Sequence, residues 1–448
     1  MRSSRVIIMS HVLRITGAAA LAAAIALGPQ ALPVAGQIAP PVTVPGVSRP
    51  VVVVTGEITG SVNWTSDFVY VLRGAVFVRD GAVLTIQAGT LIAGEAGSVG
   101  TLIVERGGKL NAFGTREQPV VFTSDQPPGT RSRGDWGGLI INGRAPTNIP
   151  GGEGVGEANT GIYGGDDPDD DSGTMRYVRV EFAGSEFSPD NELNGIAFQG
   201  VGRGGRYEYI QVHMNRDDAF EWFGGTADIK YAIASNTGDD SFDWTFGWTG
   251  RAQFLAVHQR SDDADWAIEA DNNEFNNNLL PRANPQIYNW TSCGDPDASE
   301  GVEGFRAVLF RRGTAVTFRN FLVAGSRTLG LQIDGAATLE QVTNGTTQIG
   351  AGVIWGSATP LHAGTRPFVE SGRFPDVRVN VDGGLSPDCF THESPNFQPV
   401  SVATLAGGQL APIQPPNDGF FEPVTFIGAV PPAPGDDWTR GWTAYPQQ

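Results

Sequence analysis

The chain has 448 residues, of which 60 are Gly and 17% are charged. Length alone allows two or three average domains or one elongated repeat domain. The high Gly content and the scarcity of helical spacing argue against a helical protein and favour many short strands joined by tight turns. The formal net charge of −18 argues against nucleic acid and anionic lipid as partners, because the long-range field repels them, and favours cations.

The first 36 residues have the pattern of a cleaved export signal. Arginines precede an apolar run from Ile15 to Leu27, and Val34-Ala35-Gly36 follows where signal peptidase needs small or modest side chains. The run is shorter than the roughly 20 residues of a membrane span. Residues 37–50 are rich in Pro and predict an extended linker. We therefore expect an exported protein without a membrane span after signal removal, located outside the cell, on its surface or in the periplasm.

From Val51 onward the chain consists of short apolar runs separated by Gly. Each run has the length of a strand and is too short for a helix. Examples are Ala75-Val76-Phe77-Val78, Val83-Leu84-Thr85-Ile86, Leu102-Ile103-Val104 and Pro119-Val120-Val121-Phe122. The sequence therefore predicts an all-β protein.

The middle of the chain repeats itself at a fixed interval. The phrases that begin at Tyr209, Tyr231 and Phe254 are similar and follow one another at steps of 22 and 23 residues. A second phrase, DDAFEW at 217–222, recurs as DDSFDW at 239–244 with the same step. About 22 residues form one coil of a parallel β-helix, whose coils stack about 4.8 Å apart. We predict a single right-handed parallel β-helix over residues 51–445.

Three stretches interrupt the period and predict long loops, namely residues 151–173, 272–303 and 356–415. The two cysteines of the chain, Cys293 and Cys389, lie in the second and third of them. In an exported chain an even pair of cysteines favours a disulfide over a reactive thiol. A bond between them would tie these two loops together.

Several phrases resemble known β-helix proteins. GAVLTIQAGT at 81–90 and GDWGGLIING at 134–143 resemble the pectate-lyase-like β-helix superfamily. More narrowly, four segments resemble a group of exported bacterial β-helix proteins of unassigned function, and they are DDAFEWFGG at 217–225, DDSFDWTF at 239–246, EADNN at 269–273 and DWTRGWT at 437–443. The resemblance covers most of residues 51–445. It implies the fold and assigns no reaction.

The repeated phrases predict a ladder of carboxylates on the outer surface. Phe220 and Trp222 share one parity with their counterparts in the next coil, which predicts that they point into the core and that the acid between them points outward. Like charges about 4.8 Å apart repel by roughly 3.5 kcal/mol at an effective dielectric near 20. The ladder consists of Asp217, Asp218, Glu221, Asp239, Asp240 and Asp243.

Three ways of relieving this repulsion stay open. The first is a bound cation, for which Ca²⁺ suits the oxygen donors. The second is hydration, with Asp side chains capping backbone amides at the turns. The third is a catalytic acid–base pair that shares a proton. A third copy over 262–271 is irregular, and a one-residue shift that turns Trp266 and Ile268 inward leaves the positions of Asp262, Asp263, Asp265 and Glu269 undetermined.

Other candidate residues carry weaker signals. His213 and His258 share a column two coils apart, roughly 10 Å, which argues against zinc chelation by both and favours hydrogen-bonded side chains. Trp222 and Trp244 are expected in the core, whereas Trp248, between Gly247 and Gly250, is a candidate exposed platform for a sugar. The acidic run 166–171 is expected to be a solvated loop.

Two functions follow as hypotheses. The preferred one is a non-enzymatic surface or secreted module whose acidic face binds Ca²⁺ and whose loops contact a glycan or a cell-surface protein. The alternative is a polysaccharide lyase or glycoside hydrolase with Asp217 and Asp240 as candidate catalytic acids and Arg251 as a candidate base. The doubled aspartates resemble those of inverting pectinolytic hydrolases, but the Gly-His-Gly and Arg-Ile-Lys phrases of those enzymes do not follow them.

Overall fold

The computed structural model describes residues 44–188, 191–260, 262, 264–296, 306–400 and 410–448. The predicted export signal, most of the predicted linker and Asp263 lie outside these residues. In the described part of the chain, no helix is long and apolar enough to cross a membrane.

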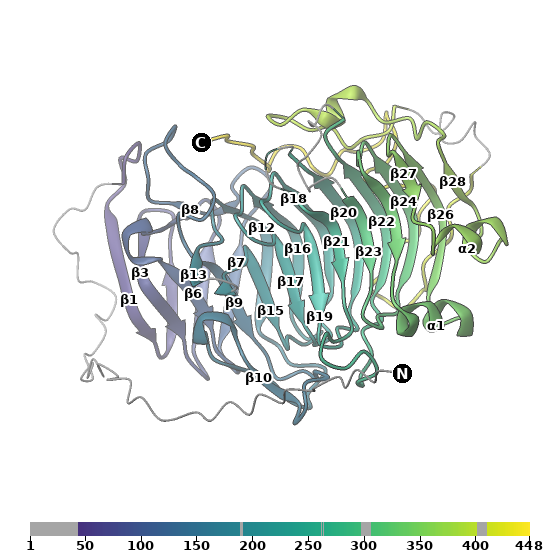
Figure 1. The fold of residues 1–448 in the computed structure, drawn as a ribbon. Coiled ribbons are helices and arrows are strands. Elements are labelled where there is room, and N and C mark those ends of the chain that lie inside the picture. Colours follow the sequence, from purple (N-terminus) through teal and green to yellow (C-terminus); the bar gives the residue numbers. More distant parts are fainter. Residues whose placement is uncertain (1–43, 189–190, 261, 263, 297–305, 401–409) are drawn as a thin grey trace, which may run out of the picture.

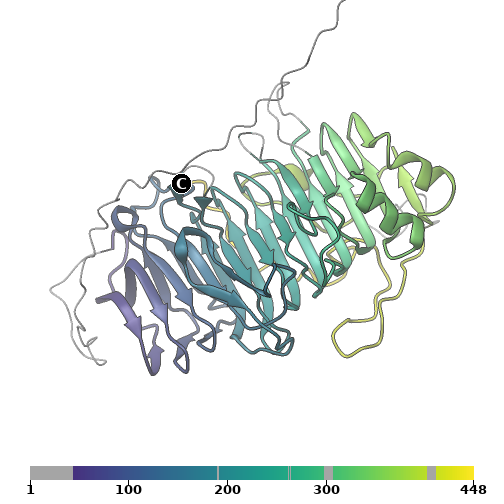
Figure 2. The same cartoon turned by 60° about the horizontal axis from the view of Figure 1, so that its bottom comes forward.

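The chain folds into a right-handed parallel β-helix, as the repeat predicted (Figures 1 and 2). Within the described residues, 24 strands form one continuous sheet with parallel pairing. Its strands are β1 Val51–Ile58, β2 Ser61–Trp64, β3 Val69–Val78, β4 Val83–Gln87, β5 Leu91–Gly94, β6 Thr101–Val104, β7 Lys109–Phe113, β8 Val120–Ser124, β9 Gly138–Asn142, β12 Gly173–Glu181, β15 Ile196–Gln199, β16 Arg206–His213, β17 Phe220–Phe223, β18 Ile229–Ser235, β19 Phe242–Thr245, β20 Arg251–His258, β21 Trp266–Ala270, β22 Gln286–Cys293, β23 Arg306–Phe310, β24 Thr317–Ala324, β25 Leu329–Ile333, β26 Gln348–Trp355, β27 Thr359–Leu361 and β28 Val377–Val379.

The remaining elements lie in the connections between coils or, in one case, after the last strand. Two hairpins are antiparallel, and they consist of β10 Glu153–Val155 with β11 Ile162–Gly164 and of β13 Glu186–Ser188 with β14 Asn191–Glu192. The helices are α1 Ala336–Asn344 and α2 Arg366–Glu370, together with the short 3₁₀ turns η1 Ala96–Ser98, η2 Glu157–Asn159 and η3 Pro387–Phe390. Two predicted loops are shorter than expected, because the stretch 272–303 contains β22 and the stretch 356–415 contains β27 and β28.

The register of the coils confirms the predicted steps. Ile210 pairs with Ala232, which pairs with Leu255 in the next coil. Phe220 pairs with Phe242 and Trp222 with Trp244, and all four side chains are buried in the main core. Phe220 and Phe242 stack with their ring centroids 4.8 Å apart. The inward parity of these aromatic residues is therefore as predicted, and it turns the intervening acids outward.

A column of aromatic residues marks one corner of the solenoid. Tyr177, Tyr209, Tyr231 and Phe254 all have a positive φ between 50° and 61°, a conformation that is strained for bulky side chains. Their rings stack from coil to coil with centroids 4.3 to 4.8 Å apart. The stacking, together with the burial of Phe254 and the partial burial of the tyrosines, stabilises the strained corners.

The C-terminal segment, residues 410–448, runs back along the solenoid from the end that carries β28 toward β8 (Figure 1). Side-chain amides of the solenoid hold its backbone: Gln211 both donates to and accepts from Ala444, at 2.8 and 3.1 Å. Gln253 forms the same double hydrogen bond with Glu422 at 2.8 and 2.8 Å. Trp438 and Trp442 are buried in the same contact, and Trp438 packs edge-on against Tyr231.

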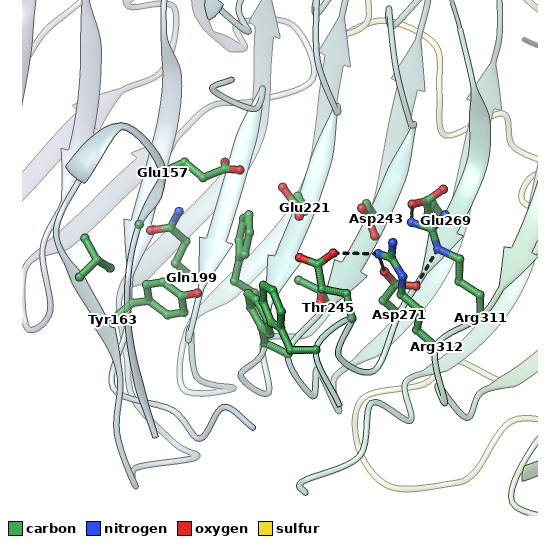
Figure 3. A pocket seen from close by; sticks show the side chains of 16 residues that line it. Glu157, Tyr163, Gln199, Glu221, Asp243, Thr245, Glu269, Asp271, Arg311 and Arg312 are labelled. Atoms are coloured by element: carbon green, nitrogen blue, oxygen red, sulfur yellow. Dashed lines mark hydrogen bonds and ion pairs between the residues drawn. The ribbon is translucent and has the colours of Figure 1, made fainter. Parts of the chain in front are cut away.

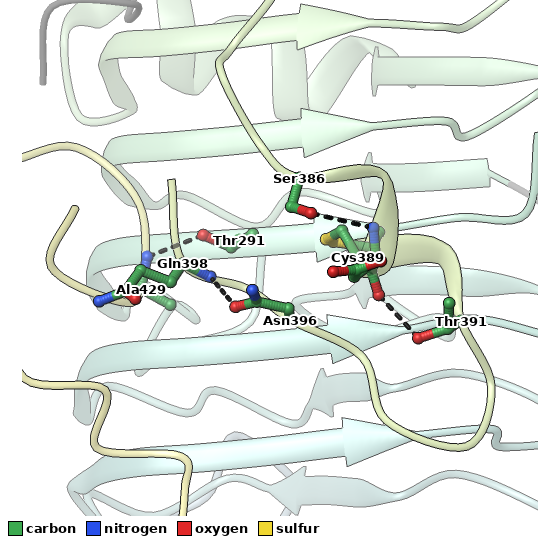
Figure 4. The surroundings of a disulfide bond; sticks show 9 residues. Thr291, Ser386, Cys389, Thr391, Asn396, Gln398 and Ala429 are labelled. Carbon is green, nitrogen blue, oxygen red and sulfur yellow. Dashed lines mark hydrogen bonds between the residues drawn. A yellow bond between two sulfur atoms is a disulfide. The ribbon is translucent and has the colours of Figure 1, made fainter. Parts of the chain in front are cut away.

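The predicted disulfide is present in the structure (Figure 4). It joins Cys293 at the end of β22 to Cys389 on η3, and the two residues have Cα atoms 5.9 Å apart and a sequence separation of 96. Both cysteines are fully buried in a cluster with Phe397, Trp438 and Trp442. The bond therefore anchors the chain that follows the last strand to the side of the solenoid.

Candidate functional site

An outward-facing column of carboxylates crosses three neighbouring coils. Glu221 on β17 pairs with Asp243 on β19, which pairs with Glu269 on β21. This register confirms the predicted shift for Ile268, which lies in the main core, and it places Glu269, whose position the sequence left undetermined, in the acidic column. Trp266 differs from the prediction: it is buried outside the main core, in a small cluster with Leu309 and Leu329, and the Arg306 guanidinium lies over its ring.

The paired aspartates gather at the corner that precedes this column. Carboxylate oxygens of Asp218, Asp240 and Asp243 lie within 4.8 Å of one another. The set Asp217, Asp218 and Asp239 and the set Asp239, Asp240 and Asp265 meet the same limit. Together these residues are called the acidic corner. All six residues of the predicted ladder thus lie in or beside it, and Asp265 joins them.

Backbone N–H groups at the turns donate hydrogen bonds to some of the carboxylates in the acidic corner. The backbone N–H of Asp240 donates to Oδ1 of Asp218 at 2.9 Å, and the N–H of Trp266 donates to Oδ1 of Asp240 at 2.6 Å. Oδ1 of Asp243, in contrast, is buried and has no hydrogen-bond partner among the described residues. Capping therefore does not satisfy every buried oxygen of this group.

The acidic corner is electrostatically unfavourable for ionised carboxylates. Burial, followed by the neighbouring carboxylates, raises the pKa of Asp218, Asp240 and Asp243 well above the usual value for Asp. Burial and the charge of Asp239 raise the pKa of Asp217 to about 7. Without a counter-charge these groups hold protons at a pH at which exposed aspartates are ionised.

A cavity of about 330 Å³ adjoins the acidic corner on the outside of the solenoid (Figure 3). The hairpin β10–β11 and the turn η2 bring Glu157 and Tyr163 to one end of it, and the connections after β21 and β23 bring Asp271, Arg311 and Arg312 to the other. It is lined by Val155, Gly156, Glu157, Tyr163, Gln199, Glu221, Phe223, Asp243, Thr245, Phe246, Glu269, Asp271, Glu274, Phe275, Arg311 and Arg312.

The end of the cavity that carries the arginines is paired internally. Arg311 forms ion pairs with Glu269 and, at 2.9 Å, with Asp271. Arg312 lies 2.7 Å from Asp271 and 3.6 Å from Glu274. Two guanidinium groups thus face three carboxylates, and little charge remains for a ligand at this end.

At the other end two carboxyl groups share one side-chain amide. Nδ2 of Asn194 donates to Oε2 of Glu221 at 2.6 Å and lies 3.3 Å from Oε2 of Glu157. Burial, with the charges of Asp217 and Glu192, raises the pKa of Glu157 to about 8. Burial also raises the pKa of Glu221 well above its usual range. This end therefore attracts cations or holds protons.

Trp248 is not the exposed platform that the sequence suggested. It is 1% exposed, its ring stacks on Trp222 with centroids 4.4 Å apart, and its indole N–H donates to the carbonyl of Ala227 at 3.0 Å. Gly250 permits this close approach, because a Cβ there would lie 2.0 Å from the same carbonyl oxygen. The ring thus fills the interior of the solenoid and cannot stack on a sugar.

The position of Arg251 does not suit the predicted role of a catalytic base, because this residue does not line the cavity. It lies at the start of β20, where Nε is 3.1 Å from both carboxylate oxygens of Asp228 and Nη1 is 2.9 Å from Asp418. These carboxylates raise its pKa further. The arginines that reach the cavity are Arg311 and Arg312.

The two histidines of the predicted column are hydrogen-bonded, as expected. His213 pairs in register with Ser235, and Ser235 with His258. Nδ1 of His213 lies 2.9 Å from Oγ of Ser235, and Nδ1 of His258 lies 2.7 Å from Oδ1 of Asn236. Burial lowers the pKa of both imidazoles to about 3, so both are neutral in ordinary buffers.

Several residues of the cavity were not predicted from the sequence. Arg311 and Arg312 follow β23, whose Phe310 pairs with Ala270, so that Arg311 comes one coil above Asp271. Extending the repeat alignment through residues 306–310 would have found this juxtaposition. Glu157 and Tyr163 lie in the insertion 151–173, which has no counterpart in other coils, so the period carries no signal for them.

Comparison with known proteins found a match to one protein family. A family model described as a pectate-lyase-like β-helix domain matches residues 56–359, which is more than half of the chain. The searches of curated proteins and of solved structures returned no match.

Proposed function

We propose that this chain, which belongs to the family of pectate-lyase-like β-helix domains, is an exported module that binds Ca²⁺ at the acidic corner. The fold of the family alone assigns no reaction. One observation carries the proposal. Asp218, Asp240 and Asp243 hold carboxylate oxygens within 4.8 Å of one another in a buried position, and Oδ1 of Asp243 lacks a partner among the described residues. A cation in their midst would offset both the mutual repulsion and the unsatisfied acceptor.

The donor set selects the kind of cation. Carboxylate oxygens are the preferred ligands of Ca²⁺, which takes six to eight oxygens in a flexible arrangement. The three clustered sets consist of aspartates alone, whereas zinc favours Cys and His. The proposed location outside the cytoplasm, suggested by the N-terminal pattern and by the disulfide, supplies Ca²⁺ and oxidising conditions. The loops beside the cavity are then the surfaces for a glycan or a cell-surface protein.

Calcium is expected to stabilise the protein through the acidic corner. At a free Ca²⁺ concentration of 100 times Kd, the free energy of unfolding should exceed that in chelator by about 2.7 kcal/mol. Asp240→Asn keeps the acceptor for the Trp266 amide but removes one charge, so it should weaken Ca²⁺ binding measured by calorimetry and reduce this gain. Asp166→Asn, an exposed residue of the insertion 151–173, is the matched control and should retain both. Equal melting curves of the native protein in Ca²⁺ and in chelator would refute the proposal.

Cleavage of a glycan is a second candidate function, and a specific observation favours it. The pKa of Glu157, raised to about 8 by burial, keeps this side chain protonated at neutral pH at one end of the cavity. Glu269 lines the same cavity and is ion-paired with Arg311. Burial raises the pKa of Glu269 to about 7, so near neutral pH it can act as the base while Glu157 holds its proton, as general acid–base catalysis requires. In this alternative Glu157 replaces Asp217 and Asp240 as the candidate acid.

A substrate screen tests this alternative. Uronate-containing and neutral glycans are incubated with the protein, and unsaturated and reducing ends are measured. If cleavage occurs, Glu157→Gln should lower the rate by about a hundredfold or more, the size of a general-acid contribution. Glu274→Gln, at the opposite end of the cavity, should keep most of the activity. Absence of new ends across the panel would rule out the enzyme and favour the binding module.

A further inference from the structure

One end of the cavity presents hydrogen-bond acceptors, and no arginine or lysine among the lining residues pairs with them. Arg311 and Arg312 direct their ion pairs to Glu269, Asp271 and Glu274. Glu157 and Glu221, at the other end, share the amide of Asn194, which is neutral. Carboxyl groups of the cavity that no arginine pairs with therefore lie at the end formed by Glu157 and Glu221, where an ammonium group would favour their ionised form.

Gln199 adds an independent observation at this end. Its side chain is 1% exposed and lines the cavity, and its Oε1 has no hydrogen-bond partner among the described residues. Figure 3 shows it between Glu157 and Tyr163. A buried amide oxygen without a partner is costly. It calls for a donor, which a ligand in the cavity would supply.

The rim of the same cavity is apolar. Phe275 is 81% exposed and Val155 is 63% exposed, and both line the cavity. The rings of Tyr163, Phe223 and Phe246 form more of its wall. Large apolar side chains exposed beside a polar cavity are typical of ligand-binding sites.

We propose that the cavity binds a primary ammonium group joined to a stem with an apolar face, such as an amino sugar or an alkyl diamine. The ammonium group has three donors and no acceptor, which matches the acceptors of Glu157, Glu221 and Gln199. The stem lies along the rim formed by Val155 and Phe275. This site goes beyond the proposed Ca²⁺ site, because its ammonium end uses none of the residues of the acidic corner.

Calorimetry with four small probes tests the proposal in chelator and again in Ca²⁺. The probes are the β-1,4 dimer of glucosamine, its N,N′-diacetylated form, 1,5-diaminopentane and the dimer of galacturonic acid. Both amines are expected to bind at least about tenfold more tightly than the acetylated dimer, because a hydrogen bond to a charged group contributes more than a neutral one. The galacturonate dimer, which is an anion, should bind most weakly. The stronger of the two amines identifies the stem as a sugar or an alkyl chain.

Variants separate this site from the Ca²⁺ site. Glu157→Gln should weaken binding of the preferred amine about tenfold or more, whereas Asp166→Asn, an exposed position of the same insertion outside the cavity lining, should leave it unchanged. Asp240→Asn should weaken Ca²⁺ binding and leave amine binding in chelator intact, so either proposal can fail alone. Melting curves verify that each variant is folded. Binding of the acetylated dimer as tight as that of the free amine, or an unchanged affinity of a folded Glu157→Gln protein, would overturn the inference.

Discussion

In a buffer that contains a chelator, the free energy of unfolding is expected to fall by several kcal/mol as the pH rises from about 6.5 to about 8.5. The native protein buries carboxyl groups whose pKa lies far above its ordinary value. Burial and nearby carboxylates raise the pKa of Glu157 to about 8 and that of Asp217 to about 7. The pKa values of Asp218, Asp240 and Asp243 are also raised well above the usual value, for the same reasons.

The sign follows from proton binding. Above pH 6.5 these groups are ionised in the unfolded chain, whereas the native state still binds protons, so a rise in pH favours unfolding. Stability is therefore lost as the pH rises through the native pKa values. One pKa unit corresponds to about 1.4 kcal/mol, so Glu157 alone contributes on the order of 2 kcal/mol between pH 6.5 and 8.

The lower limit of this window is set by the histidines. The pKa of His213 and of His258 is about 3 in the native state, against 6.5 ordinarily. Between these values the unfolded chain binds the additional protons, so the histidines increase stability with pH and oppose the carboxyl groups. Their contribution to the slope fades above pH 6.5 and is nearly gone about one pH unit higher, so over most of the window the carboxyl groups determine the slope in this part of the protein.

Urea midpoints at a series of pH values in chelator measure the effect. Glu157→Gln should flatten the slope between pH 6.5 and 8.5, whereas the exposed control Asp166→Asn should leave it unchanged. Saturating Ca²⁺ should flatten the slope of the native protein, because a bound cation favours the ionised form. Stability that rises with pH over this window in chelator would show that these carboxyl groups are not buried as described.

The fold could be predicted from the sequence because every coil of the solenoid has the same packing requirement. Each coil must present apolar side chains at the same positions as the coil beneath it, so Phe220 predicts Phe242 and Trp222 predicts Trp244. The acid between them is then turned outward in both coils. Where the copy was irregular, the requirement that Ile268 point inward was met, but the position of Glu269 stayed undetermined until the register placed it in the acidic column.

The cavity could be predicted only in part, because its residues come from two kinds of sequence. Glu221 and Asp243 lie on strands and obey the period, whereas Glu157 comes from an insertion that has no counterpart in other coils. The prediction that Trp248 is exposed was wrong for another reason. It was inferred from the neighbouring glycines, but Gly250 instead permits the indole to pack against Ala227. A glycine next to a large ring can indicate close packing as well as an exposed turn.

Loss of the disulfide is expected to lower the free energy of unfolding by about 4 to 5 kcal/mol. Cys293 and Cys389 are 96 residues apart, and closing a loop of roughly 100 residues in the unfolded chain corresponds to about 4.7 kcal/mol. The double variant Cys293→Ser with Cys389→Ser should show this loss in a urea titration. A reducing agent should lower the stability of the native protein by a similar amount and leave the double variant unchanged.

This loss should arise in the unfolded chain, because the C-terminal segment has other attachments in the native state. Gln211 and Gln253 each form two hydrogen bonds with its backbone, and Trp438 and Trp442 are buried against the solenoid. In native buffer, limited proteolysis should therefore leave residues 410–448 attached with or without the disulfide, while the urea midpoint moves. Rapid release of this segment from the double variant would show instead that the bond acts as a tether in the native protein, and that the amide contacts cannot hold the segment without it.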